Sequence, residues 1–299
     1  MDVRIFGIDL YLEPVAFSLF GKWTVYWYGI IIAAGFAVAV IYGFFNAKRF
    51  NIDVDRMIDV VLVTTPLAIL CARLYYMVFY YGKFTFKEFF GIGSSQGFSG
   101  LAIYGGVIGA AVFGSLMCKI RKIKVFDMLD LASIGFIVAQ GIGRWGNFMN
   151  QEAFGGPTGS DWWGMTSPNV ISNFIANDIS PTELAHPCFL YESVWCIAGF
   201  FLLHFISQKR KFSGQVALIY CVWYGFGRAI IECLRTDSLM IGPFKVSFLV
   251  SITASISAAI ILIVTLRKNG KEQEEYIPVF ADNEEMIDLE EESENGEDN

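Results

Sequence analysis

Seven long apolar blocks, separated by short polar stretches, dominate the pattern of hydrophobic positions along the chain. Each block is close to the roughly 20 apolar residues that a helix needs to cross about 30 Å of hydrocarbon. This pattern predicts an all-α integral membrane protein with seven transmembrane helices. The third and fourth blocks are short and interrupted by glycine, so six or eight spans are the alternative counts. The blocks are Val25–Phe45, Val60–Tyr80, Leu101–Met117, Leu129–Gly143, Phe189–Ile206, Val216–Cys233 and Val246–Leu266.

The composition agrees with a membrane protein. Hydrophobic residues make up 55% of the chain and charged residues 17%, whereas soluble proteins are typically about 25% charged. Much of the net charge of −7 arises in residues 272–299, which are rich in Glu and Asp and poor in apolar residues. We therefore predict a membrane domain over residues 1–266 and a disordered acidic tail over residues 267–299. The remainder is close to neutral and offers no basic surface for nucleic acid.

The distribution of lysine and arginine predicts the orientation in the membrane, because basic loops stay on the cytoplasmic side. One set of loops carries 13 of these residues and the opposite set carries 5. The first set follows the first, third, fifth and seventh blocks. We therefore expect the C-terminus in the cytoplasm and the N-terminus outside. The N-terminal residues lack the pattern of a cleaved signal peptide, so we expect them to be retained.

Two polar segments fall on the predicted outer side. Residues 82–100 are aromatic and contain Gly and Ser, which suits an arm that lies along the membrane surface. Residues 151–187 are too polar to cross a membrane and too rich in turn-forming residues to be one helix. We expect the second segment to form a small outer head subdomain directly after the fourth block.

Charged side chains inside apolar blocks are costly, and they therefore indicate either function or structural ion pairing. The stretch YGFGRAIIECLRT, residues 224–236, carries Arg228, Glu232 and Arg235 at the spacing i, i+4 and i+7. A helix would place all three on one face, with a surplus of positive charge. Because guanidinium groups match phosphate oxygens well, this surplus favours an anion site over purely structural pairing.

The stretch GRWGNFMNQEAFGG, residues 143–156, places a second arginine, Arg144, at the end of an apolar block. GIGRWG matches the G-x-G-x-x-G spacing of dinucleotide-binding loops, but that motif needs a preceding strand. A hydrophobic block precedes it here, so we reject that interpretation and expect the glycines to allow close helix packing. The other hydrogen-bonding side chains of the stretch are Asn147, Asn150, Gln151 and Glu152.

Three further polar side chains are candidates for function. Tyr28 begins the first block, where an interfacial aromatic residue is the ordinary explanation. Tyr104 lies beside Gly105 and Gly109, which form a G-x-x-x-G packing face. His186 is either a general base or a polar group satisfied by its neighbours. The six cysteines are scattered without a CxxC pair, so we expect neither a metal site nor a disulfide framework.

The motif GRWGNFMNQEAFG closely resembles the signature of the prolipoprotein diacylglyceryl transferases, a bacterial family of integral membrane enzymes. The segments WYG at residues 27–29, LCARLYY, GLAIYGG, HPCFLYES and GRAIIECLR resemble other parts of that family and occur in its order. Together these segments span most of the chain, from Tyr28 to Arg235.

The resemblance implies an enzyme that moves the diacylglyceryl group of phosphatidylglycerol onto a cysteine thiol. The acceptor would be the lipobox cysteine in a prolipoprotein signal peptide, and the products would be a thioether and glycerol 1-phosphate. It also implies a multi-pass protein of the bacterial cell membrane that uses no metal or cofactor. The alternative is an anionic-phospholipid transporter or scramblase, which would also need intramembrane arginines. Such proteins often carry an internal repeat, which this sequence lacks.

The functional residues of the family carry over by motif. Arg144 and Arg228 would bind the phosphatidylglycerol head group. Tyr104 stands where well-studied family members have a histidine, and because tyrosine is a much weaker base, we expect it to position substrate instead. The acceptor of the thiol proton stays open among Glu152, His186 and the substrate phosphate. The other matched positions are Tyr28, Asn147, Gly155, Glu232 and Arg235.

Overall fold

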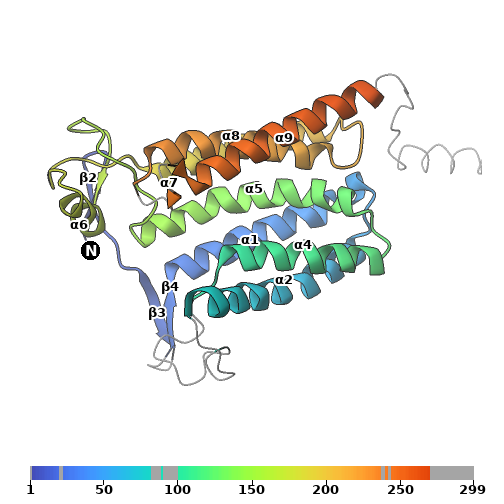
Figure 1. Ribbon diagram of the computed structural model, residues 1–299. Coiled ribbons are helices and arrows are strands. Elements are labelled where there is room, and N and C mark those ends of the chain that lie inside the picture. Colours follow the sequence, from blue (N-terminus) through green and yellow to red (C-terminus); the bar gives the residue numbers. More distant parts are fainter. Residues whose placement is uncertain are drawn as a thin grey trace, which may run out of the picture. The chain divides into compact units, whose positions relative to one another are not determined.

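The computed structural model describes residues 2–19, 23–81, 89, 100–236, 240–241 and 244–269. Within these residues, seven helices are long and apolar enough to cross a membrane, so the predicted number of spans is confirmed. The chain is therefore a multi-pass, all-α membrane protein (Figure 1). The seven helices are α1 (Trp27–Asn46), α2 (Val54–Tyr76), α4 (Ile103–Ile120), α5 (Val125–Met149), α7 (Cys188–Ser207), α8 (Gln215–Leu234) and α9 (Val246–Asn269).

The chain divides into two compact units. Unit 1 contains residues 1–43 and residues 130–277, and the described part of unit 2 lies within residues 44–129. Most of α1 and α5 and all of α7, α8 and α9 belong to unit 1, whereas α2 and α4 belong to unit 2. Shorter elements complete the description. They are the 3-10 helix η1 (Ala47–Phe50), the π-helix η2 (Met77–Tyr81), the hairpin β3 (Val15–Leu19) with β4 (Trp23–Tyr26), and the hairpin β6 (Met240–Ile241) with β7 (Phe244–Lys245).

Two predicted segments fall mostly outside the described residues. The structure describes only Phe89 and Gly100 of the predicted arm, residues 82–100, and nothing of the acidic tail after Asn269. The carbonyl oxygens of Phe89 and Gly100 accept hydrogen bonds of 3.2 and 3.0 Å from Arg73 of α2. This intramembrane arginine therefore has backbone partners.

Glycines bring α2 and α4 together in unit 2. A side-chain carbon at Gly105 would overlap the carbonyl group of Cys71 and lie 2.9 Å from Cα of Ala72. One turn later, a side-chain carbon at Gly109 would lie 3.0 Å from Cα of Ala68. The G-x-x-x-G face predicted from the sequence therefore packs backbone against backbone.

A small head at one end of the unit 1 helices combines the N-terminus with the segment between α5 and α7 (Figure 1). Its sheet is antiparallel and has the strand order β2-β1-β5. The helix α6 follows, and the Ser167 hydroxyl caps it by accepting a 3.3 Å hydrogen bond from the Val170 N–H. The N-terminal residues thus have a structural role in the head. The elements are β1 (Asp2–Ile5), β2 (Ile8–Tyr11), β5 (Met165–Thr166) and α6 (Pro168–Ala176).

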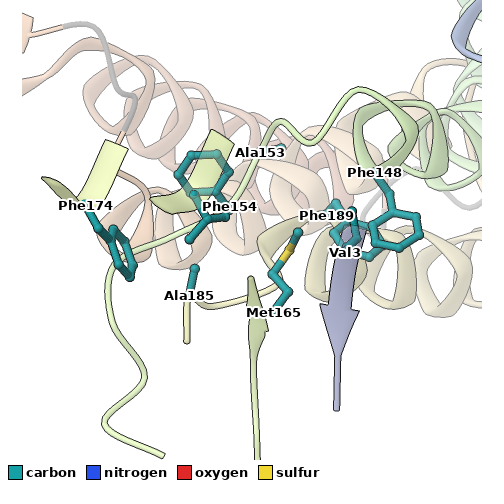
Figure 2. Packing of buried hydrophobic residues seen from close by; sticks show 9 residues of the cluster. Val3, Phe148, Ala153, Phe154, Met165, Phe174, Ala185 and Phe189 are labelled. Atoms are coloured by element: carbon teal, nitrogen blue, oxygen red, sulfur yellow. The ribbon is translucent and has the colours of Figure 1, made fainter. Parts of the chain in front are cut away.

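A buried apolar cluster fixes the head on the ends of α5 and α7 (Figure 2). Phe148 of α5 stacks on Phe189 of α7, with ring centroids 4.6 Å apart. Val3 of β1 and Met165 of β5 belong to the same cluster. Full burial of side chains of this size contributes roughly 1.5–3 kcal/mol each, so the cluster holds the segments together firmly. Its other buried members are Ala153, Phe154, Val170, Phe174 and Ala185.

Two tryptophans join α7 to α8. Trp195 and Trp223 stack with centroids 4.3 Å apart, and each indole N–H donates to the backbone carbonyl of the other, at 3.0 and 3.1 Å. Each ring also lies against a glycine of the opposite helix, Gly227 beneath Trp195 and Gly199 beneath Trp223. We call this reciprocal contact the tryptophan pair. It sets the register of α7 against α8.

Replacement of Gly105 by alanine should destabilise the protein, whereas Gly106→Ala should be nearly neutral. At Gly105 the new methyl group would meet backbone atoms, and overpacking of this kind typically costs about 1–3 kcal/mol. At Gly106 the nearest atom, Cβ of Ala72, lies 3.6 Å away. Thermal unfolding in detergent compares the two variants with the wild type. Equal melting temperatures for both variants would contradict the packing role of Gly105.

Candidate active site

Glu192 of α7 is the centre of a buried ion network in unit 1. Its side chain is only 2% exposed. Its Oε1 lies 2.6 Å from Nη2 of Arg144 on α5 and accepts a 2.8 Å hydrogen bond from the hydroxyl of Tyr224 on α8. Its Oε2 accepts a 3.1 Å hydrogen bond from Nη1 of Arg228, also on α8. One carboxylate therefore holds two arginines that come from different helices.

Close packing of α5 on α7 brings Arg144 to this carboxylate. A side-chain carbon at Gly141 would lie 3.2 Å from Cβ of Cys196. The Ser193 hydroxyl donates a 2.8 Å hydrogen bond to the backbone carbonyl of Gly141. Because α5 presents no side chain at this contact, the two backbones approach each other. Arg144, three residues after the glycine, then reaches Glu192 directly.

Arg228 has a second carboxylate partner. Its Nη2 lies 2.6 Å from Oε2 of Glu232, one turn later on α8. The stretch of residues 224–236 has one glutamate against two arginines, and Glu192 of α7 adds a second carboxylate. Arg144 and Arg228 are matched by Glu192 and Glu232, whose side chains are 2% and 1% exposed. Buried charges need such partners, and this network of two arginines and two glutamates carries no surplus of positive charge.

The two guanidinium groups are more accessible than the carboxylates that hold them. The Arg144 side chain is 20% exposed and the Arg228 side chain is 14% exposed. A guanidinium group has five N–H donors, and the ion pairs use only part of each set. Two guanidinium groups with further donors in accessible positions suit a phosphate group, whose oxygens accept bidentate hydrogen bonds.

A second series of polar contacts leads from Arg144 to Glu152. Nη1 of Arg144 donates to Oδ1 of Asn147 at 3.4 Å, and Nδ2 of Asn147 donates to Oε2 of Glu152 at 3.4 Å. Tyr28 of α1 packs beside these residues, since a side-chain carbon at Gly146 would lie 2.9 Å from its Cδ2. The structure thus links three of the predicted site residues and places Tyr28 next to them.

The Gly-Gly pair at the end of the motif holds the C-terminal end of α8. Gly155 forms a β-bridge with Arg235, and the N–H of Gly156 donates to the carbonyl of Leu234 at 2.9 Å. A side-chain carbon at Gly155 would lie 2.7 Å from that carbonyl oxygen, which leaves room only for glycine. Arg235 has extended backbone, with φ −74° and ψ 143°, because α8 ends at Leu234. Contrary to the spacing argument, Arg235 therefore does not continue the helical face of Arg228.

Lys245 of β7 caps the same end of α8. Its ammonium group donates to the carbonyl oxygens of Glu232 at 2.7 Å, Cys233 at 3.4 Å and Arg235 at 2.5 Å. Carbonyl groups at a helix C-terminus lack helical partners, and the helix dipole favours a cation there. Lys245 therefore anchors the turn of α8 that carries Glu232.

His186 lies in the segment that joins the head to α7. Its Nδ1 is 3.2 Å from the hydroxyl of Tyr191, which accepts a 2.8 Å hydrogen bond from the indole N–H of Trp163. Its backbone carbonyl accepts a 2.8 Å hydrogen bond from the N–H of Gly155. Burial lowers the pKa of His186 from its ordinary value of 6.5 and so favours the neutral imidazole. Among the described residues, no hydrogen bond joins it to either arginine of the network.

Tyr104 belongs to unit 2, where it lies in the first turn of α4. Its side chain is 47% exposed, and its ring centroid lies 6.3 Å from that of Tyr75 on α2. These contacts do not bear on the network of unit 1. The assignment of Tyr104 to the site therefore stays a prediction from the resemblance.

Glu192 and Tyr224 are members of the network that the sequence reasoning misses. Arginines in apolar blocks indicate function, and the same rule applied to acids points to Glu192 within HPCFLYES. Tyr224 carries no comparable signal, because an aromatic residue in a membrane span needs no special explanation. Only the packing of α7 on α8 shows that its hydroxyl meets a carboxylate.

The fold and the network define a multi-pass membrane protein in which a buried ion network joins three of the helices. The chain belongs to the prolipoprotein diacylglyceryl transferase family, whose model matches residues 14–264. A relative from Limosilactobacillus reuteri is 40% identical over 270 residues, which cover 88% of this chain and 94% of the relative. A relative from Bacillus cytotoxicus is 39% identical over 267 residues, covering 89% and 96%. Both are named phosphatidylglycerol–prolipoprotein diacylglyceryl transferase.

Removal of the charge on Glu192 should destabilise the fold. In Glu192→Gln, two guanidinium groups lose their shared carboxylate, and breaking a buried pair in this way typically costs about 3–5 kcal/mol. Asp161→Asn, at an exposed position of the head, is the matched control and should change stability by less than about 0.5 kcal/mol. Thermal unfolding in detergent measures both variants. An unchanged melting temperature for Glu192→Gln would contradict the central role of this carboxylate.

Proposed function

We propose that this protein transfers the diacylglyceryl group of phosphatidylglycerol to the cysteine thiol of prolipoproteins. The names of its relatives state both substrates. The observation that carries the proposal is the pair Arg144 and Arg228 held on Glu192. Phosphatidylglycerol presents a phosphate with a negative charge, and two oriented guanidinium groups suit that charge and its oxygens. The acceptor is the lipobox cysteine of the signal peptide, and the products are a thioether and glycerol 1-phosphate.

The reaction exchanges a carbon–oxygen bond for a carbon–sulfur bond. The thiolate attacks the glyceryl carbon that carries the phosphate ester, and the C–O bond breaks with its electron pair going to the phosphate oxygen. Negative charge therefore increases on the leaving glycerol phosphate. Arg144 and Arg228 face that charge and stabilise it in the transition state.

The protein prepares these arginines before the substrate arrives. Glu192 fixes both guanidinium groups, and Glu232 holds Arg228 from the other side. Lys245 holds the C-terminal end of α8 through the backbone carbonyls of Glu232 and Arg235, and Gly155 holds it through a β-bridge with Arg235. Because donors held in place need no reorganisation during the reaction, they stabilise developing charge more than solvent would.

We propose Glu152 as the acceptor of the thiol proton. It is exposed, and hydrogen bonds through the Asn147 side chain link it to Arg144, which supports a role for this carboxylate beside the bound phosphate. A thiol has an ordinary pKa near 8.5, so a base or neighbouring positive charge is needed near pH 7. The proton then passes from Glu152 to the departing phosphate or to water, which returns Glu152 to its charged form.

The same proposal includes the cellular setting. The excess of basic residues, 13 against 5, supports a cytoplasmic C-terminus and an outer head. The bacterial sources of the relatives support the bacterial cell membrane as the location. The prolipoprotein would then meet the site on the side of the membrane that its own secreted part reaches.

Arg144→Lys and Arg228→Lys should each lower kcat/KM by at least about 100-fold, the typical cost of losing one donor to developing charge. Lysine keeps the charge but loses the planar fork that binds two oxygens. Arg121→Lys, whose arginine forms a partly exposed ion pair with Asp59, is the control and should retain near-normal activity. Release of glycerol phosphate from phosphatidylglycerol with a lipobox peptide measures transfer.

Two results of this assay would contradict the proposed function. Near-normal transfer by either lysine variant would show that the arginines do not bind the phosphate. Movement of the lipid head group across the bilayer by the wild type, without release of glycerol phosphate, would favour a scramblase.

Glu152→Gln should lower the transfer rate by at least about 100-fold, as expected for a general base. His186→Asn should lower it by less than about 10-fold, because that imidazole is held by Tyr191 of α7, away from the two arginines. Burial lowers the pKa of His186 below 6.5, so any contribution of this residue to the pH–rate profile would be an acid limb. Because asparagine does not titrate, such a limb would disappear in His186→Asn. We expect the acid limb to persist in that variant. A 100-fold loss in His186→Asn, with Glu152→Gln active, would reverse the assignment.

A further inference from the structure

A second pair of polar side chains lies on the two helices that carry the arginines, one helical turn from Arg144 on α5 and two turns from Arg228 on α8. The hydroxyl of Tyr220 on α8 donates a 3.2 Å hydrogen bond to Oε1 of Gln140 on α5. Gln140 precedes Arg144 by four residues, and Tyr220 precedes Tyr224 by four and Arg228 by eight. Side chains at this spacing share a helix face. The two helices that supply the arginines thus also supply a second polar layer.

This layer is continuous with the ion network. The rings of Tyr220 and Tyr224 stack almost in parallel, with centroids 5.7 Å apart and an angle of 3° between the planes. The Tyr224 hydroxyl in turn donates to Glu192. Two hydrogen bonds and one ring stack therefore connect Glu192, through two tyrosines, to Gln140. Neither Gln140 nor Tyr220 has a role in the transfer mechanism described above.

Gln140 offers hydrogen-bond donors that no described residue uses. Its oxygen accepts from Tyr220, but its amide nitrogen donates to none of the residues that the structure describes. The residue is only part-buried, so this amide is not sealed within the core. A donor at this depth in a membrane span is costly unless it finds an acceptor. A purely structural hydrogen bond between α5 and α8 would explain the side-chain oxygen of Gln140, which accepts from Tyr220, but not its amide nitrogen.

We propose that Gln140 and Tyr220 bind the hydroxyl groups of the glycerol head group, while Arg144 and Arg228 hold its phosphate. This inference rests on the proposed function and adds the selection of the lipid. An amide and a phenol can both donate and accept, as the hydroxyl groups of a polyol do. Gln140 precedes Arg144 by one helical turn, which rises about 5.4 Å, a distance that the three-carbon chain of glycerol can bridge.

The pair would therefore determine head-group specificity. A lipid without head-group hydroxyls leaves the amide of Gln140 unpaired, and sites built to bind a hydroxyl group reject ligands that lack it. Phosphate recognition alone could not provide this selection, because every phospholipid carries a phosphate. The Gln140–Tyr220 pair is thus a binding site for a short polyol attached to the phosphate.

The test compares two lipids and three variants of the full-length enzyme in mixed micelles. The lipids are phosphatidylglycerol and phosphatidylpropanol, which has the same phosphate and carbon chain but no head-group hydroxyls. The variants are Gln140→Leu, Tyr220→Phe and the control Tyr42→Phe, which removes a tyrosine hydroxyl that instead contacts His204. Transfer of the diacylglyceryl group to a lipobox peptide gives kcat/KM for each combination.

We expect the wild type to prefer phosphatidylglycerol by at least about 10-fold, and Gln140→Leu to lose about 10-fold or more on that lipid only. Tyr220→Phe should show the same selective loss to a smaller extent, and Tyr42→Phe should show none. Equal losses on both lipids would overturn the inference, since the pair would then only join α5 to α8 or contact the phosphate. Unchanged activity on phosphatidylglycerol in Gln140→Leu would also overturn it. Failure of the wild type to transfer either lipid would instead refute the proposed function.

Discussion

Two guanidinium groups that approach one phosphate repel each other, and in a membrane-embedded bundle water screens this repulsion only weakly. Glu192 resolves the conflict, because its two oxygens each take one arginine and bring helices α5 and α8 to the same carboxylate on α7. A charged carboxylate is itself costly to bury, so the burial of Glu192 depends on its contacts with both arginines and with the Tyr224 hydroxyl. The site and the fold of these three helices are therefore held by the same interaction.

The surrounding structure serves to keep these groups in place. The tryptophan pair sets α7 against α8, and Gly141 lets α5 approach α7. Lys245 and the Gly-Gly pair hold the end of α8, and the buried cluster of Figure 2 fixes the head on α5 and α7. Small residues and reciprocal hydrogen bonds suit this task in a membrane, where the hydrophobic effect does not drive helices together. The network can then meet an anion with donors already oriented.

Much of this arrangement can be predicted from the sequence. Hydrophobic block length predicts the seven spans, and arginines in apolar blocks single out Arg144 and Arg228, which the ion network joins. Interactions between distant segments cannot be predicted in this way. The pairing of β1 with β5 depends on a contact across more than half the chain, and strands of two to four residues carry no clear alternation. Likewise, helical periodicity cannot show that α8 ends at Leu234, because the partners that end it, Gly156 and Lys245, come from other segments.

The central claim is that Arg144 and Arg228 act as one unit on a single phosphate, through their common carboxylate. A double-mutant cycle in kcat/KM, with Arg144→Lys, Arg228→Lys and the double variant, tests it most directly. If the arginines form one clamp, the kcat/KM of the double variant should be only slightly below that of the less active single variant. Residues that act as a unit have strongly non-additive effects. Losses that multiply, so that the double variant falls by the product of the single effects, would show two independent contributions and contradict the account.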